Sequence, residues 1–98
     1  MAFLYTATST KPAGVKWYGE VNRAIIDEIN EWTMEYPGIL GYKPVLVSEN
    51  EHKYIHVFQD RTTLDKFVED RAAHAGVIVR QQYNIENGIV MSKEIKEI

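Results

Sequence analysis

His56 is the residue of this sequence best placed to move a proton. It lies in the middle of a strand-like run, residues 54–58. Alternate residues of a strand point to the same side, so Tyr54 and Phe58 flank the imidazole on one face. Aromatic neighbours exclude water, and desolvation keeps an imidazole neutral, which leaves it able to accept a proton. The alternative is that His56 fills an interface between two subunits and takes no part in a reaction.

Two further histidines and an arginine are candidates for binding or proton transfer. Arg71 and His74 are three residues apart, a spacing that places both on one face of a helix. They could bind an anionic group together, or they could form a solvated or interfacial pair. His52 lies in a short polar connection, where we expect it to be exposed. No histidine or carboxylate pair has the spacing of a metal site and the chain has no cysteine, so we expect no metal and no cofactor.

A set of aromatic and cationic side chains is predicted to line a pocket between a sheet and its helices. Such residues give an apolar wall with a few polar tips, which suits a small apolar or aromatic ligand. For Trp32 the alternative is plain core packing. The predicted lining residues are Tyr5, Tyr42, Tyr54, Phe58, Trp32, Arg71 and His74.

The elements that would position these residues follow from the spacing of apolar side chains. Alternation predicts strands, and recurrence every three or four residues predicts amphipathic helices. The predicted order is strand 2–8, helix 15–36, strand 39–47, strand 54–58, helix 60–87 and strand 89–95. In the last helix Gly76 is the predicted break, and Ile78, Gln82 and Ile85 are the predicted inner stripe. Pro44 cannot donate a backbone hydrogen bond, which places its strand at an edge or a bulge.

This order predicts a ferredoxin-like α+β fold, β-α-β-β-α-β, with helices on one face of a four-stranded antiparallel sheet. The two middle strands carry apolar residues on both faces: Val45 and Val47 point one way and Leu46 the other. An antiparallel sheet with one wet face should instead alternate apolar and polar residues. We therefore expect the second face to be covered by a partner, with the protein as a homodimer.

Size and charge set the outer limits. The chain has 98 residues, which predicts a single domain over 1–98. The formal net charge is −3, which argues against a nucleic-acid partner or an anionic membrane surface. No run of apolar residues approaches the roughly 20 that a membrane-spanning helix needs. No signal peptide is evident at the N-terminus, and a cytoplasmic location is expected.

Several segments together resemble the dimeric α/β-barrel superfamily, which contains the antibiotic-biosynthesis monooxygenase-like proteins. They are the Thr-Lys-Pro loop at 10–12, the Tyr-Pro-Gly-Ile-Leu-Gly-Tyr segment at 36–42, and the Asp-Arg-Thr-Thr-Leu-Asp-Lys-Phe segment at 60–67. The resemblance implies two ferredoxin-like protomers packed sheet to sheet, each with a pocket between sheet and helices. Members of that superfamily include cofactor-free oxygenases, haem-degrading enzymes, lyases and proteins with no known activity.

Three functions were considered on this basis. The first is a cofactor-free, monooxygenase-like enzyme that acts on a small aromatic molecule. The second is a non-enzymatic homodimer that binds a small molecule or has a structural role. The third is an RNA-recognition module, which shares the order of elements, but the acidic charge argues against it.

Overall fold

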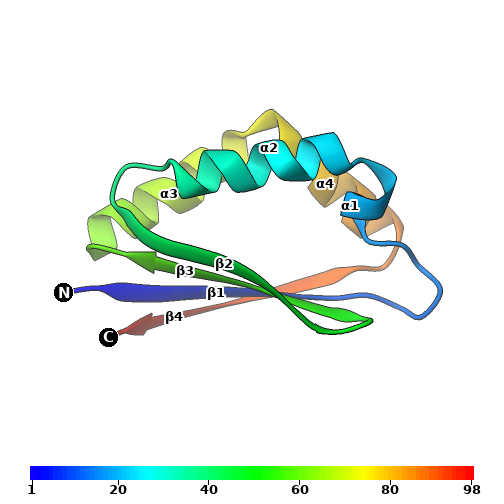
Figure 1. The fold of residues 1–98 in the computed structure, drawn as a ribbon, viewed down its shortest axis with the longest axis horizontal. Helices are drawn as coiled ribbons and strands as arrows, with labels where there is room; N and C mark the ends of the chain where they lie inside the picture. Colours follow the sequence, from blue (N-terminus) through cyan, green and yellow to red (C-terminus); the bar gives the residue numbers. More distant parts are fainter.

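A four-stranded antiparallel sheet with its helices on one face is the frame of the molecule (Figure 1). The computed structural model describes residues 1–98. Its elements in chain order are β1 (Phe3–Thr10), α1 (Tyr18–Val21), α2 (Arg23–Met34), β2 (Ile39–Ser48), β3 (Glu51–Phe58), α3 (Arg61–Ala73), α4 (Ala75–Glu86) and β4 (Val90–Glu97). The strands lie in the order β2-β3-β1-β4. This confirms the predicted ferredoxin-like α+β fold, with each predicted helix divided in two.

Two polar side chains divide the helical layer by capping a new helix within each predicted one. Asn22 Oδ1 accepts a hydrogen bond from the backbone N–H of Ile25 at 3.3 Å, which starts α2 and separates it from α1. His74 Nδ1 accepts from the N–H of Gly76 at 3.1 Å and starts α4. Each cap satisfies an N–H group that a helix start leaves free. The second break is therefore at His74. The sequence predicted it two residues later, at Gly76.

The inner face of α4 is more polar than its apolar spacing predicts. Val77, Arg80 and Asn84 are buried beneath the helix, and only the first of them is apolar. The predicted stripe at residues 78, 82 and 85 lies on the exposed side, and Ile85 is 73% exposed. That prediction is wrong because two polar residues, and not the isoleucines, face the sheet.

The sheet face beneath the helices carries the aromatic core. In the strand register His56 lies between Tyr5 on β1 and Tyr42 on β2. Tyr5 and Phe58 are at most 2% exposed, as are Leu64 and Phe67 of α3, which pack against them. Tyr54, His56 and Phe58 therefore point toward the helices, and the core they form fixes how α3 sits on the sheet.

The hairpin between β2 and β3 is tighter than its polar sequence predicts. Only Glu49 and Asn50 lie between the two strands, because β3 already begins at Glu51. His52 thus belongs to a strand and is only partly exposed, so the expectation that it is an exposed turn residue is wrong. Pro44 lies on β2, an edge strand, as predicted.

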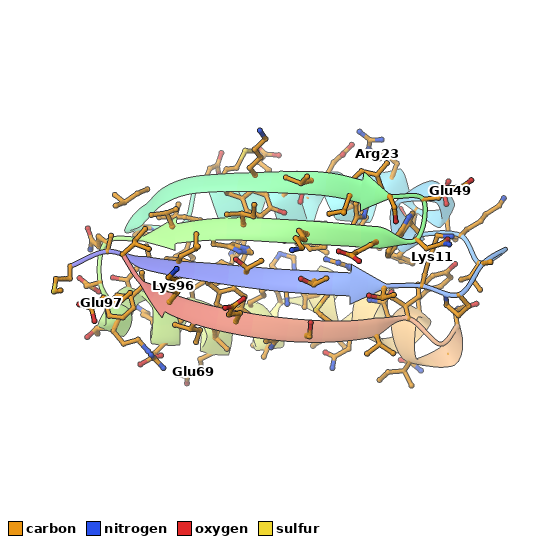
Figure 2. The ribbon with its side chains drawn as sticks, turned by 90° about the horizontal axis from the view of Figure 1, so that it is seen from below. Lys11, Arg23, Glu49, Glu69, Lys96 and Glu97 are labelled. Carbon is orange, nitrogen blue, oxygen red and sulfur yellow. The ribbon has the colours of Figure 1, made fainter.

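The helix-free face of the sheet, seen from below in Figure 2, carries a group of apolar side chains. The register brings Leu4 beside Val57, and Ile55 and Val45 lie on the same side of neighbouring strands. Charged residues share this face, with Lys43 beside Ile55 and Lys53 beside Val45 in the register and Lys96 toward one end of the sheet. None of the helices above the sheet has both the length and the apolar character to span a bilayer.

Candidate functional site

A cavity of about 440 Å³ lies between the sheet and helices α1, α2 and α4, at the end of the molecule that carries the β2–β3 hairpin. It is lined by 14 residues, against 7 for a hollow of similar volume beside Trp32. Its walls combine aromatic rings, amides and charged groups from both the sheet and the helices. The lining includes Ser9, Trp17, Tyr18, Ile26, Asn30, Leu46, His52, Tyr54 and Arg80.

His52 and Tyr54 form a hydrogen-bonded pair on the wall of this cavity. The Tyr54 hydroxyl lies 3.3 Å from His52 Nδ1, and both side chains come from the helix-facing side of β3. The indole of Trp17 stacks on the imidazole, with 4.6 Å between ring centroids. Burial, and after it the positive charge of Arg80, lowers the pKa of His52. A neutral imidazole at physiological pH can accept the phenol's proton.

Arg80 places a buried positive charge beside the same phenol. Arg80 is 7% exposed, and its guanidinium carbon lies 4.8 Å from the centre of the Tyr54 ring. The two ion pairs of the chain, Arg23–Asp27 and Arg61–Asp65, are both on exposed helix surfaces, so no carboxylate neutralises Arg80. A buried cation without a counter-ion favours any negative charge that develops nearby.

The cavity also contains a polar atom that lacks a partner. Ser9 is 1% exposed, and its hydroxyl is the one buried side-chain polar atom of the chain that forms no hydrogen bond. Such groups are rare in folded proteins because an unmet donor or acceptor is costly to bury. Since Ser9 lines the cavity, its hydroxyl is available to hydrogen-bond a molecule bound there.

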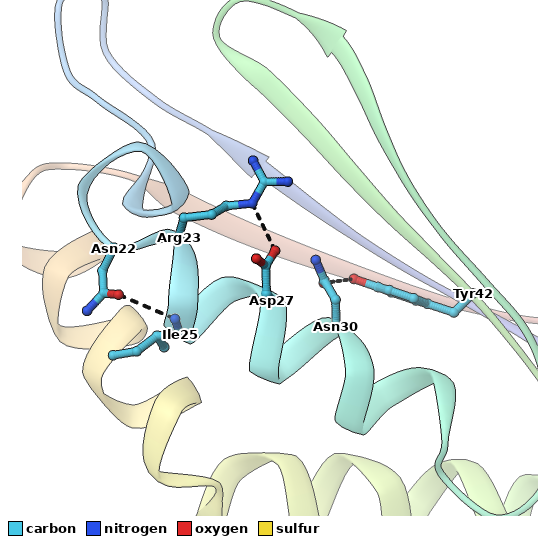
Figure 3. Close-up of polar contacts among 6 residues, drawn as sticks. All are labelled: Asn22, Arg23, Ile25, Asp27, Asn30 and Tyr42. Carbon is cyan, nitrogen blue, oxygen red and sulfur yellow. Dashed lines mark hydrogen bonds and ion pairs between the residues drawn. The ribbon is translucent and has the colours of Figure 1, made fainter.

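A second tyrosine holds an amide at the cavity edge. The Tyr42 hydroxyl donates to Oδ1 of Asn30 at 2.8 Å, as Figure 3 shows beside the Arg23–Asp27 pair and the Asn22 cap. Burial raises the pKa of Tyr42 to about 12, so this phenol keeps its proton. Tyr42 thus orients Asn30, which itself lines the cavity.

His56 occupies the core beneath the helices. It is 3% exposed, and its Nδ1–H donates to the backbone carbonyl of Tyr5 at 3.1 Å. The rings of Tyr5 and Tyr42 lie about it, with centroids 5.1 and 4.8 Å away. Burial lowers its pKa to about 4, so the imidazole is neutral. His56 is absent from the lining of the 440 Å³ cavity, and its role as a proton carrier stays a prediction.

The other predicted lining residues fall in three places. Tyr5 and Phe58 are in the core, and Trp32 and His74 line the hollow formed with Tyr36. Arg71 lines a separate cavity beside β4. Arg71 and His74, for which joint binding of an anion or a solvated or interfacial pair was predicted, thus line different cavities. Of the predicted set only Tyr54 lines the 440 Å³ cavity, where the sequence argument missed His52, Arg80 and Ser9. The signal for His52 was available, since it precedes Tyr54 by two residues on the same strand face.

Acid should destabilise the protein through His56. The unfolded imidazole titrates near pH 6.5 and the folded one near 4, so the unfolded state takes up a proton first as the pH falls. The free energy of unfolding should fall by about 2–3 kcal/mol between about pH 6.5 and about pH 4. Urea unfolding at several pH values measures this. His56→Gln should remove that part of the slope and His74→Gln should retain it; equal slopes in both variants would contradict the assignment.

Comparison with known proteins places the fold. No protein-family model matches this sequence, and no curated protein matches it. The solved structure of SnoaB, a cofactor-independent oxygenase from Streptomyces nogalater, is similar with a TM-score of 0.68 and 10% identity, over 99% of this chain and 92% of that one. A candidate antibiotic biosynthesis monooxygenase from Deinococcus radiodurans gives 0.71 and 13%, over 98% and 91%. Another, from Nitrosomonas europaea, gives 0.73 and 8%, over 99% and 89%.

At these identities the likeness concerns the fold alone. It extends over nearly the whole of each chain, so the overall topology is shared. The chain therefore has the fold of the antibiotic-biosynthesis monooxygenase-like proteins, which confirms at the level of fold the resemblance found in the sequence.

Proposed function

We propose that this protein is a cofactor-free, monooxygenase-like enzyme whose 440 Å³ cavity binds a small phenolic aromatic molecule. The observation that carries the proposal is the Tyr54 phenol on the cavity wall, with the imidazole of His52 beside its hydroxyl and the guanidinium of Arg80 against its ring. An acceptor for the proton and a cation for the charge are what abstraction of a weakly acidic proton needs.

The walls of the cavity suit an aromatic ring. Trp17, Tyr18 and Tyr54 offer π-faces, and Leu46 and Ile26 supply aliphatic contacts. Ser9 and the Asn30 amide supply polar contacts, and the charged side chains of Glu20, Arg23 and Glu49 also line the cavity. The volume falls in the range of about 300–1,000 Å³ that is usual for small-molecule sites.

The proposed reaction converts an acidic CH₂ group, as in the keto tautomer of a phenol, to a carbonyl. The CH₂ group gives a proton to Tyr54, whose own proton passes to His52, and Arg80 stabilises the carbanion. The carbanion reduces O₂ and forms a carbon–oxygen bond, and the proton returns to give a hydroperoxide. Loss of water leaves the carbonyl, so substrate and O₂ together give the quinone-like product and one water. SnoaB, which shares the fold, is described as a cofactor-independent oxygenase, and that description supports this chemistry here.

Oxygen uptake by the purified, chelator-treated protein tests this proposal. 1-Naphthol and other phenols and hydroxyquinones serve as substrates, and the product is identified by mass. The expected result is one O₂ consumed for each quinone formed. No uptake with any substrate, together with binding of those same molecules, would contradict the enzyme and favour the non-enzymatic binding protein. One observation favours that second reading, since 3.3 Å is long for the contact between Tyr54 and His52.

The proposal includes a homodimer formed through the helix-free face of the sheet. Leu4, Val45, Ile55 and Val57 are apolar side chains of that face. Burying such a side chain is worth roughly 1.5–3 kcal/mol before the costs of association. A second copy of the same face offers a self-complementary surface.

Light scattering at micromolar concentration should therefore find a dimer. Val57→Lys should give a folded monomer, because the ammonium group would be buried without a partner in the interface. Ile78→Lys is the matched control, since Ile78 is 49% exposed on the helical side, and it should remain dimeric. A monomeric wild-type protein would contradict the proposed interface.

A further inference from the structure

A second cavity, of about 270 Å³, lies between α3, α4 and the edge strand β4. Three cationic side chains line it: Arg71 from α3, Arg80 from α4 and Lys93 from β4. No aspartate or glutamate lines it. The cations thus converge from three elements on one space that holds no negative charge.

None of these three cationic side chains forms an ion pair with another part of the chain. Neither Arg71 nor Arg80 takes part in either of the two ion pairs. Asp70, the residue before Arg71, accepts a hydrogen bond from the Tyr36 hydroxyl at 2.6 Å and is held on the other side of α3. Burial, and after it repulsion from Arg80, lowers the pKa of Arg71. Folding therefore brings two guanidinium groups together without a counter-ion, an arrangement that a bound anion would relieve.

The remaining walls of the cavity indicate what kind of anion it takes. Val77 and Ile89 are 4% and 6% exposed and give the cavity an apolar floor. An inorganic ion gains nothing from contact with apolar side chains. The hydrocarbon part of an organic anion is stabilised when it is buried against them. Arginine presents paired N–H donors that match the two oxygens of a carboxylate.

We propose that this cavity binds an organic carboxylate with a short apolar body, held by Arg71, Arg80 and Lys93 over Val77 and Ile89. The site shares Arg80 and Asn84 with the cavity of the reaction proposed above, and differs from it by containing Arg71 and Lys93 and by lacking His52 and Tyr54.

Calorimetric titration of the full-length protein at low ionic strength tests this site, with hexanoate as the probe and hexanamide as its uncharged match. Hexanoate should bind at least about ten-fold more tightly than hexanamide, which is the usual worth of a charge-assisted hydrogen bond. Arg71→Gln should weaken hexanoate binding by about ten-fold or more, and Lys93→Gln by about three-fold because Lys93 is exposed. Lys96→Gln is the matched control, three residues along β4, and should leave the affinity unchanged.

Equal affinity for hexanoate and hexanamide would overturn the proposal, as would undiminished binding in both Arg71→Gln and Lys93→Gln. If Arg71→Gln fails to fold, Lys93→Gln decides between the outcomes, since it alters an exposed side chain. Inorganic phosphate that displaces hexanoate at equal concentration would overturn the assignment to an organic anion.

Discussion

Replacing His52 with glutamine should lower kcat/KM for oxygen-dependent turnover by about 10²–10⁴-fold, the usual contribution of a positioned general base. Tyr54→Phe should lower it by a similar factor, because the two residues form one proton path through a single hydrogen bond. Both substitutions keep the size of the side chain close to the original. The melting temperature of each variant should therefore stay near that of the wild type, which separates a chemical loss from a loss of fold.

His56→Gln is the discriminating control for this result. His56 is buried against Tyr5 and lies outside the lining of the cavity, so its substitution should change stability more than turnover. Turnover lost in His56→Gln and kept in His52→Gln would contradict the assignment and return the proton-transfer role to His56. The pH profile gives a second check. The proposed base must be neutral to act, and the pKa of His52 is lowered, so kcat/KM of the wild type should decline only below about pH 6.5. This decline should change in the His52→Gln variant.

Replacing Phe67 with alanine should cost about 3–5 kcal/mol of the free energy of unfolding, the range for removal of a buried aromatic ring. Phe67 is 0% exposed, and its ring centroid lies 4.9 Å from that of Phe58 and 5.1 Å from that of Tyr36. It therefore joins α3 to both the sheet and the end of α2. The cavity left behind would lie at the centre of the core, where neighbours held by the sheet cannot move to fill it.

Urea unfolding at one fixed protein concentration measures this loss, because the stability of a dimer depends on concentration. Ile85→Ala is the control and should change the free energy of unfolding by less than about 0.5 kcal/mol, since its side chain is 73% exposed. A large loss for Ile85→Ala and a small one for Phe67→Ala would mean that α4, and not α3, packs by the stripe that the sequence suggested.

The fold was predictable because its signals are local and repeated. Period-two alternation marked the strands, and Pro44 marked the edge strand. The side of the sheet that carries His56 was not predictable, because both faces of β3 bear apolar residues and alternation alone cannot say which one the helices cover. The break at Asn22 was missed, and the break at His74 was predicted two residues away at Gly76, because a cap depends on the geometry of a single side chain.

The site was predicted only in part, for a physical reason that Arg80 illustrates. Apolar spacing identifies residues that are buried to make a core, and it ranks an arginine as a surface residue. Arg80 is buried all the same, against the ring of Tyr54 and with no carboxylate partner. Ser9 is likewise a polar residue held beneath the helices by its place on β1. Residues buried for binding break the pattern on which sequence interpretation depends.

The central claim, that the cavity beside Tyr54 is where the aromatic molecule reacts, is tested most directly by a crystal structure of the protein with the naphthoquinone product of 1-naphthol. The account predicts that the bound ring lies between Trp17 and Tyr54, with one ligand oxygen in hydrogen-bonding distance of the Tyr54 hydroxyl. A ring bound in the hollow of Trp32 and His74, with the cavity beside Tyr54 unoccupied, would contradict it.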